Sequence, residues 1–416
     1  MRPLSTFERL LWLHDQAEPT HFSVSGLIEG ATTVEEWKMA LTLLQRRHPL
    51  LRVSIQTDRN GVPFFQEEVA ARVPLRVVEW NSEEQLEQEV AREIATPFYA
   101  TTKAPLLRAT VLHEKKRSIV ILAAHHSIAD GISLAYAIRD LVRALAGETL
   151  EPLPFPPSHE ELLGLAEDPA ESATSRAKRS INPEFFRLVP KVASLLLSRK
   201  LTADLRERAQ LEGTSVHGAL LAAIVFAAGE LGVGGDRAQL NLASPISTRK
   251  ALNQGDICTM LTDIGFQEAS IPESGDFWEL ARNIRNDLAP QASLERITGA
   301  RGEFRRMFAD ARDGETIVQM VRGHFHPDFT LSNLGDPGLE TQVGRLRLAA
   351  LWGPSILMGC REDQQFLGAA TANGRLSLLY SSYKPIPRLL ETVQSTLAEH
   401  VPASTQVSPS GLTLSA

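Results

Sequence analysis

Two adjacent histidines, His125 and His126, are followed four residues after the second by Asp130. A neutral imidazole can accept a proton near pH 7, because its ordinary pKa lies close to that pH. Acyl transfer from a thioester to an alcohol needs such a base, since the alcohol attacks well only as its proton is removed. Asp130 would orient His126 directly or shape the loop, and Gly131 would let the backbone turn tightly. On spacing alone, a general base and an incidental histidine pair are equally good interpretations.

The segments on either side of the histidines strengthen the catalytic interpretation. The run Ser118–Ala124 is continuously apolar, which is typical of a strand buried on both faces. After Gly131 the apolar residues recur at helical spacing until Gly147, a plausible helix stop. The pattern therefore predicts that His125 and His126 lie at a strand-to-helix junction, where a rigid core presents side chains to a cleft.

The rest of the chain alternates strand and helix patterns, which predicts an α/β fold. In the first half we expect a helix capped by Thr33 and a polar helix near Ser82, among the strands 21–28, 52–56, 63–67, 74–80 and 106–114. In the second half we expect helices over 203–211, 214–231, 277–288 and 389–400, with Thr202 as the cap of the first. We expect the remaining strands at 239–244, 329–334, 346–351, 365–370 and 376–381.

The chain has 416 residues, which is long enough for two domains of roughly 200 residues each. A proline-rich stretch followed by small and acidic residues predicts a linker over 151–185. The predicted division is therefore an N-terminal subdomain over 1–150, the linker, a C-terminal subdomain over 186–402 and a loose tail over 403–416.

Composition and charge exclude several classes of function. The net charge of -7 comes from interspersed acidic and basic residues, so no nucleic-acid partner is expected. The two cysteines, Cys258 and Cys360, predict neither a disulfide framework nor a metal site. His324 and His326 have only Asp328 near them, so no metal is expected there either. The longest apolar run, Ala219–Ala228, is about half of a membrane span, so we expect a cytoplasmic protein without a stable membrane anchor.

Four segments resemble one known family. The sequence from His125 to Gly131 matches the HHxxxDG signature of the condensation-domain acyltransferase superfamily. That superfamily includes chloramphenicol acetyltransferase (CAT), peptide synthetase condensation domains, wax ester synthases and polyketide-associated acyltransferases. The opening Arg2–Glu8 looks like the family's first segment, and Arg46–Arg52 looks like its "RHP-L-R" stretch. Thr330–Gly335 resembles its "SN-G" strand, so the resemblance covers nearly the whole chain.

The resemblance implies two CAT-like subdomains that form a V-shaped pseudo-dimer with a central tunnel. Donor and acceptor would enter from opposite faces and meet at His126, the general base. It also implies that Asp130 is structural and pairs with Arg249, which weakens its reading as a direct partner of His126. A hydroxyl or amide of Ser332 or Asn333 would donate a hydrogen bond to the developing oxyanion. A strand end that uses Ser, Asn and Gly as turn residues remains nearly as good an interpretation.

The expected function is transfer of an acyl group from a coenzyme A or acyl-carrier-protein thioester to a hydroxyl, or an amine, of a small natural product or lipid. The thioester is a donor substrate, and no permanently bound cofactor is expected. The partners would be a small-molecule alcohol or amine and, as a candidate, an acyl carrier protein. The chain carries no adenylation motif or carrier segment, which predicts a stand-alone enzyme, and a monomer.

Three alternative functions also fit parts of the sequence. A condensation enzyme would form an amide or ester between two carrier-bound substrates. A non-catalytic binding module would keep the fold, although the intact HHxxxDG segment argues against it. Glycerolipid acyltransferases use an H-x4-D spacing that His125 and Asp130 also fit, but they usually carry a membrane anchor and basic surroundings that are absent from this chain.

Overall fold

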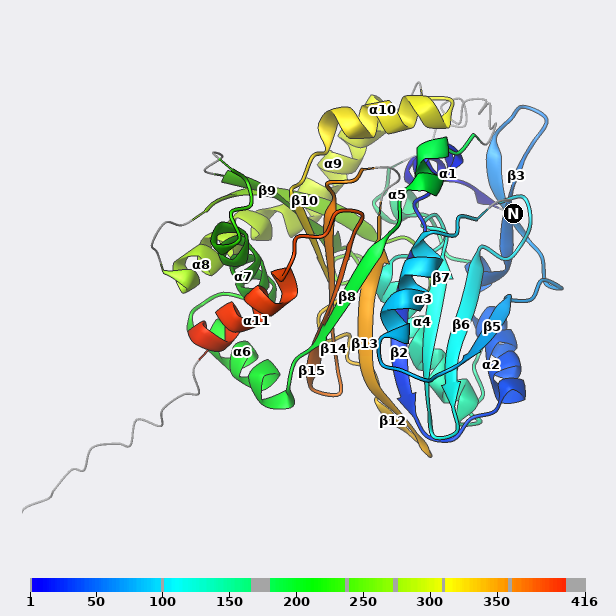
Figure 1. The fold of residues 1–416 in the computed structure, drawn as a ribbon. Helices are drawn as coiled ribbons and strands as arrows, with labels where there is room; N and C mark the ends of the chain where they lie inside the picture. Colours follow the sequence, from blue (N-terminus) through cyan, green and yellow to red (C-terminus); the bar gives the residue numbers. More distant parts are fainter. Residues whose placement is uncertain are drawn as a thin grey trace, which may run out of the picture.

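The fold was analysed on a computed structural model, which describes residues 2–98, 101–165, 180–235, 239–271, 276–308, 311–357 and 361–401. Cys360, the expected tail 403–416 and residues 166–179 of the expected linker lie outside these described residues. Within them the chain forms two six-stranded mixed sheets and one three-stranded sheet, with helices packed around them (Figure 1). The α/β class expected from the alternating patterns is therefore confirmed.

The first large sheet carries the histidine segment at one strand end. Its order is β12 (Gln342–Val343), β13 (Leu346–Ile356), β2 (Phe22–Glu29), β7 (Arg117–Ala124), β6 (Leu107–Glu114) and β5 (Leu75–Glu79). Its helices are α2 (Val34–Arg47), α3 (Gln85–Ile94) and α4 (Gly131–Leu145). β7 is buried along most of its length because α4 packs on one face of the sheet and α3 on the other. His125 and His126 therefore lie directly after the end of a central, buried strand, which holds them in place.

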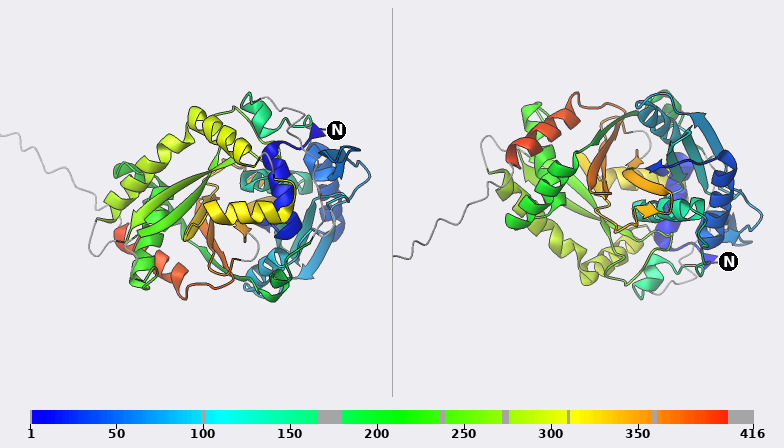
Figure 2. Two further views of the ribbon diagram at one scale, coloured as in Figure 1. Left: turned by 90° about the horizontal axis from the view of Figure 1, so that it is seen from above. Right: turned by 90° about the horizontal axis from the view of Figure 1, so that it is seen from below.

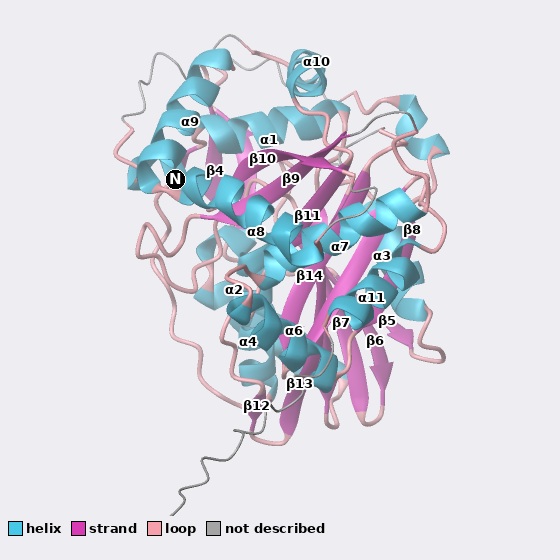
Figure 3. Cartoon of the chain, turned by 90° about the vertical axis from the view of Figure 1, so that its left-hand side faces the viewer, coloured by secondary structure: helices cyan, strands magenta, loops and turns pink. Residues whose placement is uncertain are grey.

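The second large sheet faces the first. Its order is β10 (Thr262–Ser270), β9 (Gln239–Ser247), β11 (Phe329–Asn333), β14 (Gln365–Ala372), β15 (Arg375–Ser382) and β8 (Lys191–Leu196). Its outer face is covered by α6 (Arg199–Leu211), α7 (Val216–Glu230), α8 (Phe277–Leu288) and α11 (Leu389–His400), as Figure 3 shows. The apolar α7 is the centre of this second core, with ten of its 15 residues buried.

The two sheets meet at β13. This strand follows β11 in the chain, yet it pairs with β2 and completes the first sheet. Its other face packs against β14 and β15 of the second sheet, where Ser355 Oγ and Ser381 Oγ lie 2.6 Å apart. Gly368 of β14 lies so close to β13 that a Cβ there would overlap the Pro354 carbonyl oxygen. β13, together with the short β12 that pairs with it, therefore belongs to one half by sequence and to the other by hydrogen bonding.

The smaller elements close the molecule at the end that holds the histidines. They are β1 (Arg2–Pro3), β3 (Val53–Thr57) and β4 (Pro63–Glu67), which form the three-stranded sheet, and α1 (Thr6–Ala17), α5 (His159–Leu162), α9 (Leu294–Met307) and α10 (Gly314–His324). Three short 3-10 helices span Pro49–Arg52, Pro183–Arg187 and Ala289–Ala292. α10 crosses from the second half and lies on α1, as the view from above shows (Figure 2).

Several sequence expectations match the structure closely. Thr33 caps α2 through a reciprocal capping box with Glu36, and α8 and α11 have the expected bounds. Gly147, with φ +90°, lies in the left-handed region just after α4, as expected of a helix stop.

Other boundaries were wrong for local reasons. Ser82 does not cap α3, because Gln85 Oε1 accepts hydrogen bonds from the Asn81 and Ser82 amides and the helix starts only at Gln85. Thr202 does not cap α6, because Ser198 takes that position and the helix starts at Arg199. The strand expected to stop before Pro245 continues through it to Ser247.

In the described part of the chain, no single helix has the length and apolar character needed to cross a membrane. α6 and α7 meet that criterion only as a joined pair, which is bent by 102°.

The close approach of Gly368 to β13 gives a stability prediction. Gly368→Ala should lower the free energy of unfolding by about 1 to 3 kcal/mol, because the new Cβ forces the two sheets apart. Gly299→Ala in α9 is the control, since its Cβ would meet no atom within 4 Å and alanine favours a helix by about 0.5 to 1 kcal/mol. Urea denaturation of both variants measures the difference, and equal stabilities would refute the tight-contact argument.

Candidate active site

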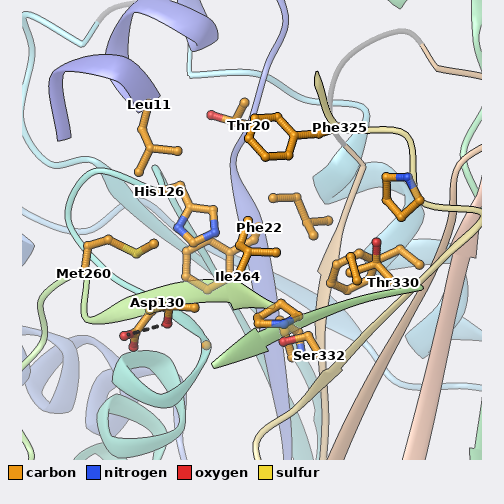
Figure 4. Close-up of a pocket in the computed structure, with 18 of the residues that line it drawn as sticks. Leu11, Thr20, Phe22, His126, Asp130, Met260, Ile264, Phe325, Thr330 and Ser332 are labelled. Atoms are coloured by element: carbon orange, nitrogen blue, oxygen red, sulfur yellow. Dashed lines mark hydrogen bonds between the residues drawn. The ribbon is translucent and has the colours of Figure 1, made fainter. Parts of the chain in front are cut away.

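A cavity lies between the two halves and contains His126 in its wall. The first half contributes α1, β2 and the segment after β7, and the second half contributes β9, β10, β11 and residues around α10. Figure 4 shows the ring of His126 beside Phe22, with Met260, Ile264 and Ser332 from the second half around it. The histidine predicted from sequence is therefore placed where two substrates could meet.

The hydrogen bonds of His126 fix its tautomer. Its Nδ1 lies 3.0 Å from the Ala129 carbonyl oxygen. Because a carbonyl can only accept, Nδ1 carries the hydrogen and Nε2 keeps its lone pair. No residue that the structure describes forms a hydrogen bond with Nε2. The imidazole is thus poised to accept a proton at Nε2.

The surroundings of His126 keep it neutral. Burial lowers the pKa of His126 below its usual 6.5, and the Ala129 carbonyl and the Asp130 charge oppose this only in part. The ring of Phe22 packs on the imidazole with 4.5 Å between ring centroids and supplies part of that burial. At pH 7 the neutral form therefore predominates, and the lone pair on Nε2 is available.

His125 points away from the cavity into the first core. The Ser127 amide donates to His125 Nδ1 over 3.2 Å, so the ring hydrogen is on Nε2. His125 Nε2 faces the carboxylate of Asp15 at 3.5 Å, and both side chains are fully buried. The geometry of His125 fits a role in holding the loop rather than contact with a substrate.

The carboxylate of Asp130 binds the start of α4 to the second half. It caps the helix by accepting from the Ser133 amide at 2.8 Å, and it accepts from the Leu261 amide at 3.0 Å. Burial alone would raise the pKa of Asp130, but the charge of Arg249 and these donors outweigh it and lower the pKa. Asp130 is therefore ionised, and no hydrogen bond joins it to the ring of His126.

Arg249 supplies the counter-charge from the other half. Its Nη2 lies 3.0 Å from Asp130 Oδ1, which is the contact that the resemblance implies, and both side chains are almost completely buried. The guanidinium also donates to the carbonyls of Ile257 at 2.9 Å and Thr259 at 3.0 Å. One arginine thus ties the loop after β9 to the helix that follows the histidines.

The structure explains the glycine at position 131 differently from the sequence, which suggested a tight backbone turn. Its φ does not lie in the positive range that favours glycine, so turning freedom is not what the position uses. A Cβ there would lie 2.7 Å from Leu334 Cδ2 and 3.3 Å from Pro354 Cγ. Glycine is needed because the ends of β11 and β13 approach the start of α4 closely.

Ser332 and Asn333 both line the cavity but differ in their partners. Asn333 Oδ1 accepts from the Gly335 amide at 2.8 Å, which is the turn geometry that the sequence left open. The hydroxyl of Ser332 has no hydrogen-bond partner among the described residues, and Figure 4 places it on the wall near Ile264. The hydrogen bond to Gly335 uses only the oxygen of the Asn333 amide, so the N–H groups of Asn333 and the hydroxyl of Ser332 both remain as candidate donors.

Sequence reasoning missed most of the apolar wall. Phe22, Met260 and Ile264 come from segments separated by up to 242 positions, and nothing in the local pattern brings them together. For Phe22 a signal existed, since it begins the strand that pairs with Ala124 just before the histidines.

The residues considered for metal binding do not form a site in the described chain. His324 Nδ1 donates to the Met320 carbonyl at 2.8 Å, and no group of three His, Cys, Asp or Glu side chains in the described residues could hold a metal ion.

Comparisons with known proteins follow the same division into halves. Residues 1–178 match the family model described as "Condensation domain", and residues 187–335 match "Phthiocerol/phthiodiolone dimycocerosyl transferase C-terminus". The chain is 31% identical over 176 residues to surfactin synthase subunit 2 of Bacillus subtilis (strain 168), which is 41% of this chain and 5% of that protein. It is 33% identical over 156 residues to bacitracin synthase 3 of Bacillus licheniformis, which is 36% of this chain and 2% of that protein. The chain thus spans only a small part of these curated relatives.

Solved structures share the whole fold at low identity. The polyketide synthase associated protein 5 from Mycobacterium tuberculosis gives a TM-score of 0.65 at 17% identity, covering 97% of this chain and 98% of that one. The first condensation domain of the CDA synthetase gives 0.68 at 15% identity, covering 96% of both chains. These likenesses confirm the expected pseudo-dimer of two halves.

The Asp130–Arg249 pair gives a second prediction. Arg249→Met should lower the free energy of unfolding by about 3 to 5 kcal/mol, because it leaves the buried Asp130 carboxylate without its cation. The exposed pair Arg347–Glu29 is the control, and Arg347→Met should cost at most about 1 kcal/mol. Chemical denaturation measures the free energy of unfolding of both variants. A similar small decrease in each would show that the buried pair stabilises the fold no more than the exposed pair does.

Proposed function

Because the chain belongs to the condensation-domain superfamily of acyltransferases, we propose that it transfers an acyl group from a thioester to a hydroxyl, or an amine, with His126 as general base. The donor would be an acyl-coenzyme A or the phosphopantetheinyl thioester of an acyl carrier protein. The observation that carries the proposal is the tautomer of His126, which leaves Nε2 unprotonated in the wall of the cavity between the halves.

The proposed reaction needs only this base and a donor for the oxyanion. His126 Nε2 accepts the proton of the acceptor hydroxyl as its oxygen attacks the thioester carbonyl carbon. The carbonyl oxygen becomes an oxyanion, to which the free hydroxyl of Ser332 would donate a hydrogen bond. When the carbon–sulfur bond breaks, Nε2–H returns the proton to the leaving sulfur. The products are the ester, or the amide from an amine, and the free thiol.

Asp130, Arg249 and His125 act in this proposal as positioning residues. Asp130 follows Ala129 in the chain, and the carbonyl of Ala129 is what holds the His126 tautomer. By fixing Asp130, the Arg249 pair therefore also fixes the carbonyl that orients the base. Both halves of one chain supply the site, which supports action as a monomer.

A second candidate is amide or ester formation between two carrier-bound substrates. It is supported by the match of residues 1–178 to the condensation-domain model and by the peptide synthetases among the relatives. The base and its tautomer would serve this reaction unchanged, and an acyl carrier protein would then be a partner.

Replacement of the base tests the proposal. His126→Ala should lower the rate of thiol release from acyl-coenzyme A in the presence of an acceptor about 10²- to 10⁴-fold, because general-base catalysis contributes that much. The exposed His324→Ala variant is the control and should keep the wild-type rate. An unchanged rate in His126→Ala would refute the enzymatic proposal and leave a binding module of the same fold.

The pH dependence follows from the lowered pKa of His126. The base must be neutral, so kcat/KM should stay high below pH 6.5 and fall only as the pH drops through the lowered pKa. Phe22→Ala removes part of the burial, so its acid limb should move up toward pH 6.5. Profiles of both proteins from about pH 5 to 8 measure this. A wild-type acid limb above pH 6.5, or no shift in the variant, would contradict it.

A further inference from the structure

We propose that the cavity beside His126 accepts an uncharged alkyl or aryl group of the substrate and excludes a substrate that carries there an ammonium group other than the reacting amine. The inference rests on the proposed function, since it treats this cavity as the substrate site. It is carried by two features of the walls, their apolar surface and the pairing of every described charge.

The wall on the first half is an apolar face of α1. Phe7, Leu10 and Leu11 recur at the spacing of one helix face and all line the cavity. The opposite side is closed by Val321 of α10 and by Phe325 directly after it. Figure 4 shows Leu11 and Phe325 on opposite sides of the space above His126.

The wall on the second half leaves large apolar side chains uncovered. Ile264 and Phe266 lie two residues apart, on the same face of the edge strand β10. Their side chains are 44% and 40% exposed. Both line the cavity, and Phe266 stacks on Phe325 with 5.3 Å between ring centroids. Apolar surface gains free energy when it is removed from water, so a bound alkyl or aryl group would be stabilised here.

The charged side chains in the described walls are already engaged. Glu18 and Arg322 form an ion pair, and Asp130 is paired with Arg249. Arg361 donates to the Phe325 carbonyl at 3.0 Å and lies 3.4 Å from Asp363. A substrate ammonium brought into this cavity would find no carboxylate without a partner among the described lining residues, and an unpaired buried charge is strongly disfavoured.

The neutral donors on the walls accommodate an uncharged polar group. Thr330 and Ser332 lie two residues apart on β11, and both line the cavity. Neither hydroxyl has a hydrogen-bond partner among the described residues. A carbonyl or hydroxyl of the substrate could therefore be bound without any charge.

Equilibrium binding of two matched alcohols tests the inference without turnover. The probes are 1-octanol and 7-amino-1-heptanol, in which an ammonium replaces the terminal methyl group. The dissociation constant of the amino alcohol should be about 100-fold higher, or more, because its charge must be buried unpaired. Ligand-observed NMR or calorimetry on the full chain measures both constants. Equal binding, tighter binding of the amino alcohol, or no binding of octanol would overturn the inference.

A pair of variants with matched exposure sharpens the test. Ile264→Glu places a carboxylate in the cavity wall and should weaken octanol binding while it strengthens amino-alcohol binding about tenfold or more. Leu294→Glu is the control, since Leu294 is 46% exposed, close to the 44% of Ile264, and does not line the cavity. The same change of preference in both variants, or in neither, would overturn the inference.

The outcomes separate this inference from the proposed function. If octanol binds selectively but no thioester is consumed, the proposed function fails and the inference stands. If thioesters are turned over and the ammonium-bearing probe binds as well as octanol, the inference alone fails.

Discussion

The buried carboxylate of Asp130 is the interaction on which the site depends. A carboxylate without water is strongly disfavoured, and here it accepts from Ser133, Leu261, Thr262 and Arg249. Leu261 directly precedes β10, Thr262 begins it, and Ser133 lies on α4, so the charge can be satisfied only when both halves are in place. The Asp130 carboxylate therefore has all of its partners only when the two halves are packed together.

The geometry of His126 follows from this pairing. Asp130 caps α4, and the preceding carbonyl of Ala129 accepts a hydrogen bond from His126 Nδ1. The other fixed contact between the halves lies at β13, where small residues let the sheets touch. The site lies between these two contacts, with α10 across α1 as a third link. A base held in this way needs little reorganisation during proton transfer.

Local patterns in the sequence were enough to predict several elements that position the site. The apolar run of β7, the capping box of α2 and the helix after Gly131 depend on neighbouring residues, and all three are present. The proximity of Asp130 and Arg249 was available only through the family resemblance. β8 and β10 were missed, because the residues of β10 alternate between buried and exposed at an edge and carry few apolar side chains. The reason for Gly131 and the sheet to which β13 belongs depend on contacts across the chain, which no local pattern encodes.

The chemistry of the base and the character of the cavity support one another. The burial that lowers the pKa of His126 comes from the same apolar surroundings that favour an uncharged substrate. The charge of Asp130 acts in the opposite direction and would favour an imidazolium, which cannot accept a proton. Arg249 neutralises that charge at 3.0 Å. Burial of the imidazole outweighs the Asp130 charge, so an ionised aspartate can lie four residues from the base while the base stays neutral.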